Sequence, residues 1–147
     1  KELNKINIAR GILEGHINNL HYGFRKLPVN PKIIHLTGGL SNSFSWRQTI
    51  SDIFDCDTIR VDGEGAAIGA AIHSIWVWLR ENKNSIEISE ICEQFINYDL
   101  STMCKPRNEF KNVYFKQRRL FKALSNRIRN TGKDENPFEI RSLFLNK

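Results

Sequence analysis

The sequence is poor in methionine and cysteine, and it lacks long apolar runs. Met103 is the only methionine, and three cysteines stand far apart as Cys56, Cys92 and Cys104. An odd number of cysteines without a C-x-x-C pair argues against a disulfide framework and against a zinc site. The pattern favours a reducing, cytoplasmic compartment. Because no apolar run approaches the roughly 18 residues that span a bilayer, we expect no membrane segment.

The chain also lacks an initiator methionine, since it begins at Lys1. Its first residues do not form the apolar centre of a secretory signal. We therefore expect a piece of a longer protein, with structural elements missing before Lys1.

The residues that are present predict a single globular domain. The 147 residues are 40% hydrophobic and 26% charged, which is enough for one core and too little for two domains. The net charge of +6 is uneven, because residues 105–147 hold 12 Lys or Arg against 4 Asp or Glu. Such a basic segment suits a nucleic acid, an anionic partner or a solvated helix face.

Hydrophobic periodicity predicts an α-β-α-β-α order in the first half of the chain. Helical spacing covers residues 4–26, 45–54 and 68–79, and the last of these carries the strongest apolar stripe. Residues 32–36 are β-branched and apolar, as in a strand buried on both faces of a parallel sheet. Residues 58–62 predict a second strand. The order favours an α/β layer with parallel strands and right-handed crossovers.

The second half of the chain predicts mainly helix. Apolar spacing indicates a short helix around residues 88–95 and a long one from Pro106 to about Asn130. Residues 131–147 contain Gly132 and Pro137, and we expect a loosely held tail. Two parallel strands do not form a stable sheet alone, so we expect N-terminal strands to be missing.

Gly38 and Gly39 are the strongest candidates for a binding site. Glycines at the carboxyl end of a parallel strand let a ligand lie against the backbone. The turn amides and the following helix suit an anion or a nucleotide. A plain tight turn fits the spacing equally well, because the segment is neither G-x-G-x-x-G nor a P-loop.

The small-residue run at positions 63–71 is a second candidate. It predicts a helix start that lies close to a neighbouring backbone, and packing is the favoured role. Glu64 is an alternative ligand contact, although the helix dipole also favours a carboxylate in the first turn. The four histidines form no metal-ligand pattern and favour core or surface roles.

The basic residues of the long C-terminal helix are spread around it instead of forming one stripe. This distribution favours a solvated face over a nucleic-acid site. The residues are Lys111, Lys116, Arg118, Arg119, Lys122, Arg127 and Arg129.

Several ordered motifs resemble the FGGY family of carbohydrate kinases, which belongs to the actin/hexokinase/Hsp70 superfamily of ATPases. An apolar strand ends in Gly38-Gly39, and residues 46–54 (WRQTISDIF) and 64–71 (EGAAIGAA) follow as in the family. Residues 9–15 (ARGILEG) are similar to its R-A-x-x-E-G helix, with Gly11 where alanine is usual. Residues 114–119 (YFKQRR) resemble the closing helix of xylulokinases, so the match leans toward that subgroup.

The resemblance implies an α/β fold, a partial actin-like (ribonuclease H-like) ATPase domain with parallel strands and flanking helices. Residues 1–130 would form the carboxyl-terminal ATP-binding lobe. The implied reaction transfers the γ-phosphate of MgATP to a sugar hydroxyl, with D-xylulose as the expected sugar. Gluconate, glycerol and deoxy-sugar kinases are alternatives, and so is a non-catalytic module that binds nucleic acid through the basic helix.

The resemblance also assigns nucleotide contacts to Gly38, Gly39, Leu40 and Ser43, with Ser43 beside the adenine. Leu40 replaces a smaller residue, and Ser43 replaces the asparagine of some relatives. The catalytic aspartate, the Mg²⁺ ligands and the sugar pocket are expected in an N-terminal partner lobe. We therefore expect this chain to be inactive alone. Without the partner lobe, the apolar surface that would contact it is exposed, so a homodimer is a further possibility.

Overall fold

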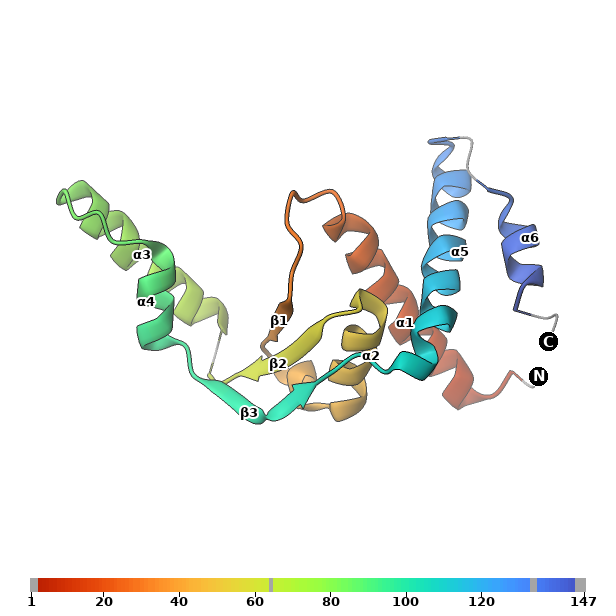
Figure 1. Cartoon of the computed structure of the whole chain (residues 1–147), viewed down its shortest axis with the longest axis horizontal. Helices are drawn as coiled ribbons and strands as arrows, with labels where there is room; N and C mark the ends of the chain where they lie inside the picture. The colour runs from red at the N-terminus through yellow and green to blue at the C-terminus, as the bar shows by residue number, and fades with distance from the viewer. Residues whose placement is uncertain (1–2, 64, 133–134, 145–147) are drawn as a thin grey trace.

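We describe the fold from a computed structural model, which covers residues 3–63, 65–132 and 135–144. The described residues form mainly helices, and the three strands lie between two groups of helices (Figure 1). The helices are α1 (Lys5–Phe24), α2 (Phe44–Phe54), α3 (Gly65–Glu81), α4 (Ile88–Phe95), α5 (Lys111–Arg129) and α6 (Pro137–Ser142). The strands are β1 (Ile33–Leu36), β2 (Asp57–Val61) and β3 (Tyr98–Cys104), and short 3-10 helices η1 (Gly39–Asn42) and η2 (Asn108–Phe110) complete the list.

The sheet is mixed and has the order β1-β2-β3. β1 and β2 are parallel, with Ile33 opposite Asp57, as the α-β-α-β-α pattern predicts. β3 runs antiparallel to β2, with Thr58 opposite Cys104. The sequence analysis missed β3, because residues 98–104 follow a helix and do not alternate cleanly between apolar and polar. The expectation of an all-parallel sheet is therefore wrong for the described residues.

The expectation that β1 is buried on both faces is also wrong. Its residues alternate between exposed and half-buried, and Ile33 is 37% exposed. β1 lies at the edge of the sheet and pairs with β2 alone among the described strands. His35, expected in a buried strand, is exposed and contacts the ring of Tyr98 at 4.7 Å between centroids. The central strand β2 holds the buried positions instead, including Thr58 and Ile59.

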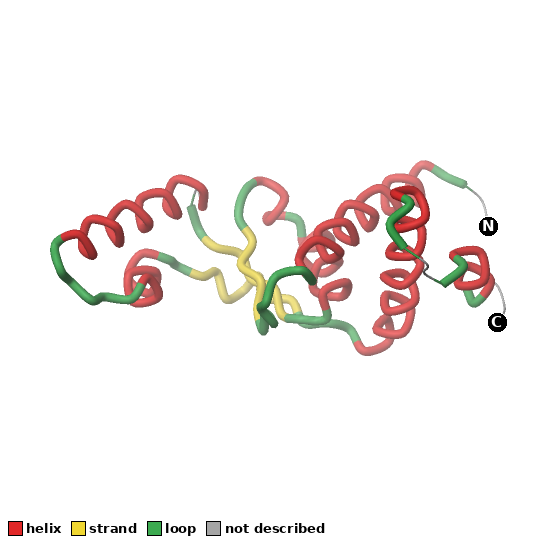
Figure 2. The backbone as a smooth tube through the Cα atoms, turned by 90° about the horizontal axis from the view of Figure 1, so that it is seen from above, coloured by secondary structure: helices red, strands yellow, loops and turns green. Residues whose placement is uncertain are grey.

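The main core lies where α1, α2 and α5 meet. Ile17, Ile50, Ile53 and Tyr114 form its buried cluster, and Leu36 at the end of β1 packs against it. Seen from above, these helices stand at one end of the molecule, and α3 with α4 reaches out at the other (Figure 2). The sheet between them links the two ends.

The apolar stripe of α3 forms the predicted helix, but the described residues do not bury it. α3 packs mainly against α4, and Ile72 is its one buried residue. Trp78 is 63% exposed. Helical periodicity thus predicted the element, and its burial depended on what packs against it. None of the helices in the described ranges is both long and apolar enough to cross a membrane.

Part of the C-terminal segment forms a helix where the sequence predicts a loosely held tail. α6 packs against α5, and Pro137 and Ile140 are buried. The guanidinium of Arg127 lies over the ring of Phe138, 5.3 Å from its centroid. The N-cap is Asn136, whose side chain accepts a hydrogen bond from the Phe138 amide. These contacts hold residues 136–142 against α5.

Candidate functional site

The turn at Gly38-Gly39 and the small-residue run that begins at Gly63 meet beyond the carboxyl ends of β1 and β2, around an open pocket of about 520 Å³. They meet there because β1 and β2 are parallel, so that the carboxyl ends of both strands lie on the same side of the sheet. The sequence singled out both segments separately, and the fold joins them. The lining residues are Thr37, Gly38, Gly39, Ser41, Asn42, Arg60, Val61, Gly63, Gly65, Ala66 and Ala67.

The first wall is the turn after β1. Gly38 has a φ of 83°, which glycine adopts without strain. The Gly38 carbonyl accepts hydrogen bonds from the Ser41 hydroxyl at 2.7 Å and the Ser41 amide at 3.0 Å. A Cβ added at Gly39 would meet nothing within 4 Å. Ser41 therefore satisfies the Gly38 carbonyl within the turn, and the backbone at Gly39 borders open space.

The second wall is the start of α3. The Gly65 amide donates a hydrogen bond to the Thr37 hydroxyl at 3.1 Å. A Cβ at Gly65 would lie 2.5–2.7 Å from Thr37 side-chain atoms, so only glycine permits this approach. A Cβ at Gly69, one turn later, would meet nothing within 4 Å. The tightest approach in this run is therefore at Gly65, and it is to the side chain of Thr37 and not to the neighbouring backbone that the sequence predicts. Glu64, the alternative ligand contact, lies outside the described residues.

Arg60 is a lining residue that the sequence analysis missed. It lies near the end of β2, and its side chain is one-third exposed. Its guanidinium is 3.4 Å from the Asp62 carboxylate and 4.0 Å from the Asp99 carboxylate. It is the one charged residue among the described residues that line the pocket, and the two carboxylates offset part of its charge. An arginine in an alternating strand carries no local signal of such a role, because the pocket arises from chain segments far apart.

Leu40 and Ser43 do not line this pocket. They border a second hollow of about 390 Å³, which α1 and the start of α2 complete with residues such as Leu13 and Trp46. The Ser43 hydroxyl accepts a hydrogen bond from the Trp46 amide at 3.4 Å and caps α2. The helix therefore begins at Phe44, one residue before the helical spacing that starts at position 45. The four predicted contacts, Gly38, Gly39, Leu40 and Ser43, are divided between two hollows that both border η1.

The polar residues of the W-R-Q motif form the scaffold under η1. The Arg47 guanidinium donates to the Ser41 carbonyl at 2.7 Å and to the Thr102 carbonyl at 3.0 Å. Asp52, whose side chain is fully buried, accepts from the Arg107 guanidinium at 2.6 Å and 3.1 Å. These bonds fasten η1 and the end of β3 to α2. The motif thus holds the turn in place without lining the pocket.

The described residues fit phosphates better than they fit a metal ion. An unhindered backbone at Gly39 and the cation of Arg60 suit the phosphates of a nucleotide. By contrast, no group of three or more His, Cys, Asp or Glu side chains in the described ranges is arranged to hold a metal. We therefore assign no Mg²⁺ ligand to this part of the protein.

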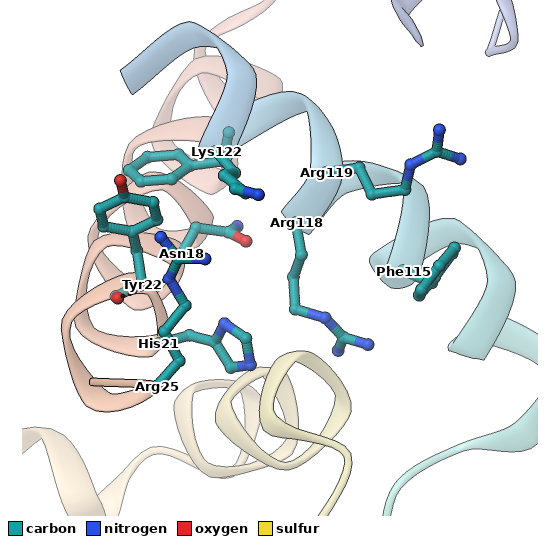
Figure 3. A pocket seen from close by; sticks show the side chains of 9 residues that line it. Asn18, His21, Tyr22, Arg25, Phe115, Arg118, Arg119 and Lys122 are labelled. Atoms are coloured by element: carbon teal, nitrogen blue, oxygen red, sulfur yellow. Dashed lines mark hydrogen bonds between the residues drawn. The ribbon is translucent and has the colours of Figure 1, made fainter. Parts of the chain in front are cut away.

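The basic residues of α5 make contacts within the chain. Lys111 pairs with Asp55 at 2.8 Å, and Arg119 pairs with Glu135. Arg118 donates to the Ile53 carbonyl. These contacts place three of the seven basic residues against neighbouring segments of the chain, and Figure 3 shows Arg118 pointing from α5 toward α2.

Comparison with known proteins shows which family the sequence matches. Residues 1–78 match the C-terminal domain of the FGGY family of carbohydrate kinases. Xylulose kinase from Haemophilus influenzae is 30% identical over 116 residues, which covers 74% of this chain and 22% of that protein. The chain thus spans about a fifth of the length of this curated relative.

Proposed function

Because the chain belongs to the FGGY family of carbohydrate kinases, we propose that it forms the ATP-binding side of a sugar kinase. The reaction is transfer of the γ-phosphate of ATP to a sugar hydroxyl. Similarity to a xylulose kinase favours D-xylulose as the sugar. Gluconate, glycerol and deoxy sugars remain alternatives. Three free thiols in the described residues accord with the reducing cytoplasm as the place of action.

The observation that carries the proposal is the open backbone at Gly39 beside the pocket between the strand ends. In this proposal the phosphates rest on Gly38 and Gly39, and Arg60 neutralises part of their charge. The base lies on the other side of η1, against Leu40, Ser43 and the apolar wall that includes Trp46. Both hollows border the same short turn, which suits a ligand with a charged end and a flat apolar end.

Phosphoryl transfer depends mainly on positioning and charge stabilisation. This chain's own contribution is to bind and orient the nucleotide, through the turn at Gly39 and the charge of Arg60. Mg²⁺, when bound with ATP, neutralises charge on the phosphates. We propose that the acid-base group, the metal ligands and the sugar pocket come from a separate N-terminal lobe, which is the expected partner.

Replacing Gly39 by alanine tests the nucleotide site. The added methyl meets no protein atom, so the fold should tolerate it and Tm should change by less than about 2 °C. The methyl would occupy space assigned to the phosphates, and ATP affinity should fall by about tenfold. Isothermal titration of the 147-residue chain with ATP measures the affinity, and a thermal melt measures the stability.

Gly69→Ala is the matched control, because it also adds one methyl into open space but lies on α3 outside the pocket. It should leave ATP affinity unchanged. Equal ATP affinity in Gly39→Ala and the unchanged chain would contradict the assignment of Gly39 to the nucleotide site.

The chain alone is expected to release no ADP above the blank when ATP, Mg²⁺ and D-xylulose are supplied. The reason is that no described residue is assigned to the acid-base step or to the sugar. Adding the N-terminal lobe of a xylulose kinase should produce sugar-dependent turnover in a coupled assay. Gluconate, glycerol and a deoxy sugar, tested in parallel, identify the preferred substrate. Turnover by the chain alone would contradict the proposal that the acid-base group and the sugar pocket lie in a separate lobe.

A further inference from the structure

Strand β3 bulges where it passes the end of β2. Thr58 lies opposite Cys104 and Arg60 lies opposite Asp99, so that residue 59 of β2 faces residues 100–103 of β3. Thr102 lies within this bulge and is 9% exposed. Bulges change the direction of nearby side chains and are frequent beside functional sites. The side chain next to this bulge is that of Arg60, which lines the pocket at the strand ends.

The Thr102 hydroxyl supplies a hydrogen-bond partner that the irregular pairing would otherwise leave out. Its Oγ1 accepts a hydrogen bond from the Arg60 amide at 3.0 Å, and the hydroxyl donates to the Asp99 carbonyl at 2.6 Å. Loss of the hydroxyl would leave the Arg60 amide without this acceptor at a buried position, which is costly. The backbone of Arg60 is therefore held in place by Thr102.

The same bulge holds a carboxylate beside the Arg60 side chain. Asp99 Oδ1 accepts hydrogen bonds from the Ser101 amide at 3.2 Å and from the Ser101 hydroxyl at 2.5 Å. The other oxygen, Oδ2, lies 4.0 Å from the Arg60 guanidinium, and the Asp62 carboxylate lies 3.4 Å from it. Because two carboxylates offset part of the charge of Arg60, the contribution of this residue to the pocket depends on where its guanidinium is placed.

The Thr102 carbonyl connects Arg60 to the turn after β1. This carbonyl accepts a hydrogen bond from Arg47 Nε at 3.0 Å, and Arg47 also donates to the Ser41 carbonyl at 2.7 Å. The Ser41 hydroxyl in turn donates to the Gly38 carbonyl at 2.7 Å. An unbroken series of contacts therefore runs from Arg60 through Thr102 and Arg47 to the turn. Thr102 itself lines neither of the two hollows beside η1.

We propose that Thr102 is a positioning residue of the nucleotide site. It touches no ligand, and it sets where the Arg60 guanidinium meets the phosphates relative to the backbone of Gly38 and Gly39. The inference rests on the nucleotide site proposed above and extends it to β3. Because β3 lies outside residues 1–78, this role belongs to a segment that the family match does not cover.

Titration of the 147-residue chain with ATP and with adenosine tests this role. Thr102→Val keeps the branched shape and removes the hydroxyl, so that the Arg60 amide loses its acceptor. ATP affinity should fall by about tenfold, whereas adenosine affinity should change by less than about twofold, because adenosine has no phosphates for Arg60 to contact. A purely structural role would lower the affinities for both ligands alike or leave both unchanged.

Thr102→Ser is the matched control, because it keeps the hydroxyl, and it should hold ATP affinity within about twofold of the unchanged chain. Thr102→Ala removes the same hydroxyl without adding an atom, and it replaces Thr102→Val if a thermal melt shows that valine unfolds the chain. Arg60→Gln should itself weaken ATP binding by about tenfold. Since Thr102 acts through Arg60, Thr102→Val should cause no further loss in a chain that already carries Arg60→Gln.

The results separate the failure of this role from the failure of the nucleotide site. If neither Gly39→Ala nor Arg60→Gln weakened ATP binding, the nucleotide site would be wrong, and the role of Thr102 with it. If both weakened it but loss of the Thr102 hydroxyl did not, the positioning role alone would be wrong. The same conclusion would follow if adenosine affinity fell as much as ATP affinity, if serine failed to restore ATP affinity, or if the effects of Thr102→Val and Arg60→Gln were additive.

Discussion

Replacing Arg47 by alanine is expected to lower the free energy of unfolding by about 3 kcal/mol, because two hydrogen bonds from a buried charged group are lost. Arg47 is 8% exposed, and its donors hold the carbonyls of Ser41 and Thr102. Without them, two carbonyls lose their charged donor and η1 loses its tie to α2. ATP affinity should therefore fall together with stability.

Urea denaturation measures the stability change, and titration with ATP under native conditions measures the affinity. Arg47→Lys keeps the charge but not the forked geometry, so its effect should be intermediate. Arg141→Ala, an exposed position on α6, removes the same side chain and should change stability by less than about 0.5 kcal/mol. If Arg47→Ala were as stable as Arg141→Ala, the scaffold role of the W-R-Q motif would be wrong.

We expect the second large loss of stability when Gly65 is replaced by alanine. The new Cβ would lie within 2.7 Å of the Thr37 Cβ, Oγ1 and Cγ2. Since a β-branched side chain is stiff, the start of α3 must move away from the end of β1. Overpacking of this kind costs about 1–3 kcal/mol. It also separates the two walls of the pocket, so ATP affinity should fall more than stability alone accounts for.

A double-mutant cycle tests whether the clash with Thr37 causes the loss of stability in Gly65→Ala. Thr37→Ala removes two of the three clashing atoms, so Thr37→Ala with Gly65→Ala should be more stable than the sum of the two single changes predicts. Gly69→Ala, on the same helix, should be neutral or should stabilise by up to about 1 kcal/mol through helix propensity. Additive effects at positions 37 and 65 would show that the two walls do not meet as described.

Patterns within short stretches predicted the parts of the fold that depend on local chemistry. Helical spacing in residues 4–26 and 68–79 corresponds to α1 and α3, and the two strand-like runs correspond to the parallel pair β1 and β2. β3 was missed, because its pairing with β2 is decided by a partner about forty residues away in the chain and not by its own pattern. The burial of β1 was overestimated for the same reason: an apolar strand is buried only when something covers it.

The candidate site also combines features that the local sequence predicts with features that only tertiary contacts decide. The sequence by itself determined that the chain turns at Gly38 and Gly63, since both adopt a positive φ that few other residues accept. It also carried the motifs that place the chain in its kinase family. Only the tertiary structure decided that Thr37 meets Gly65, that Arg60 faces the pocket, and that Ser43 caps a helix beside a different hollow. Those outcomes depend on contacts between distant segments, and a linear pattern does not encode which side chains the packing of β1, β2 and α2 will bring together.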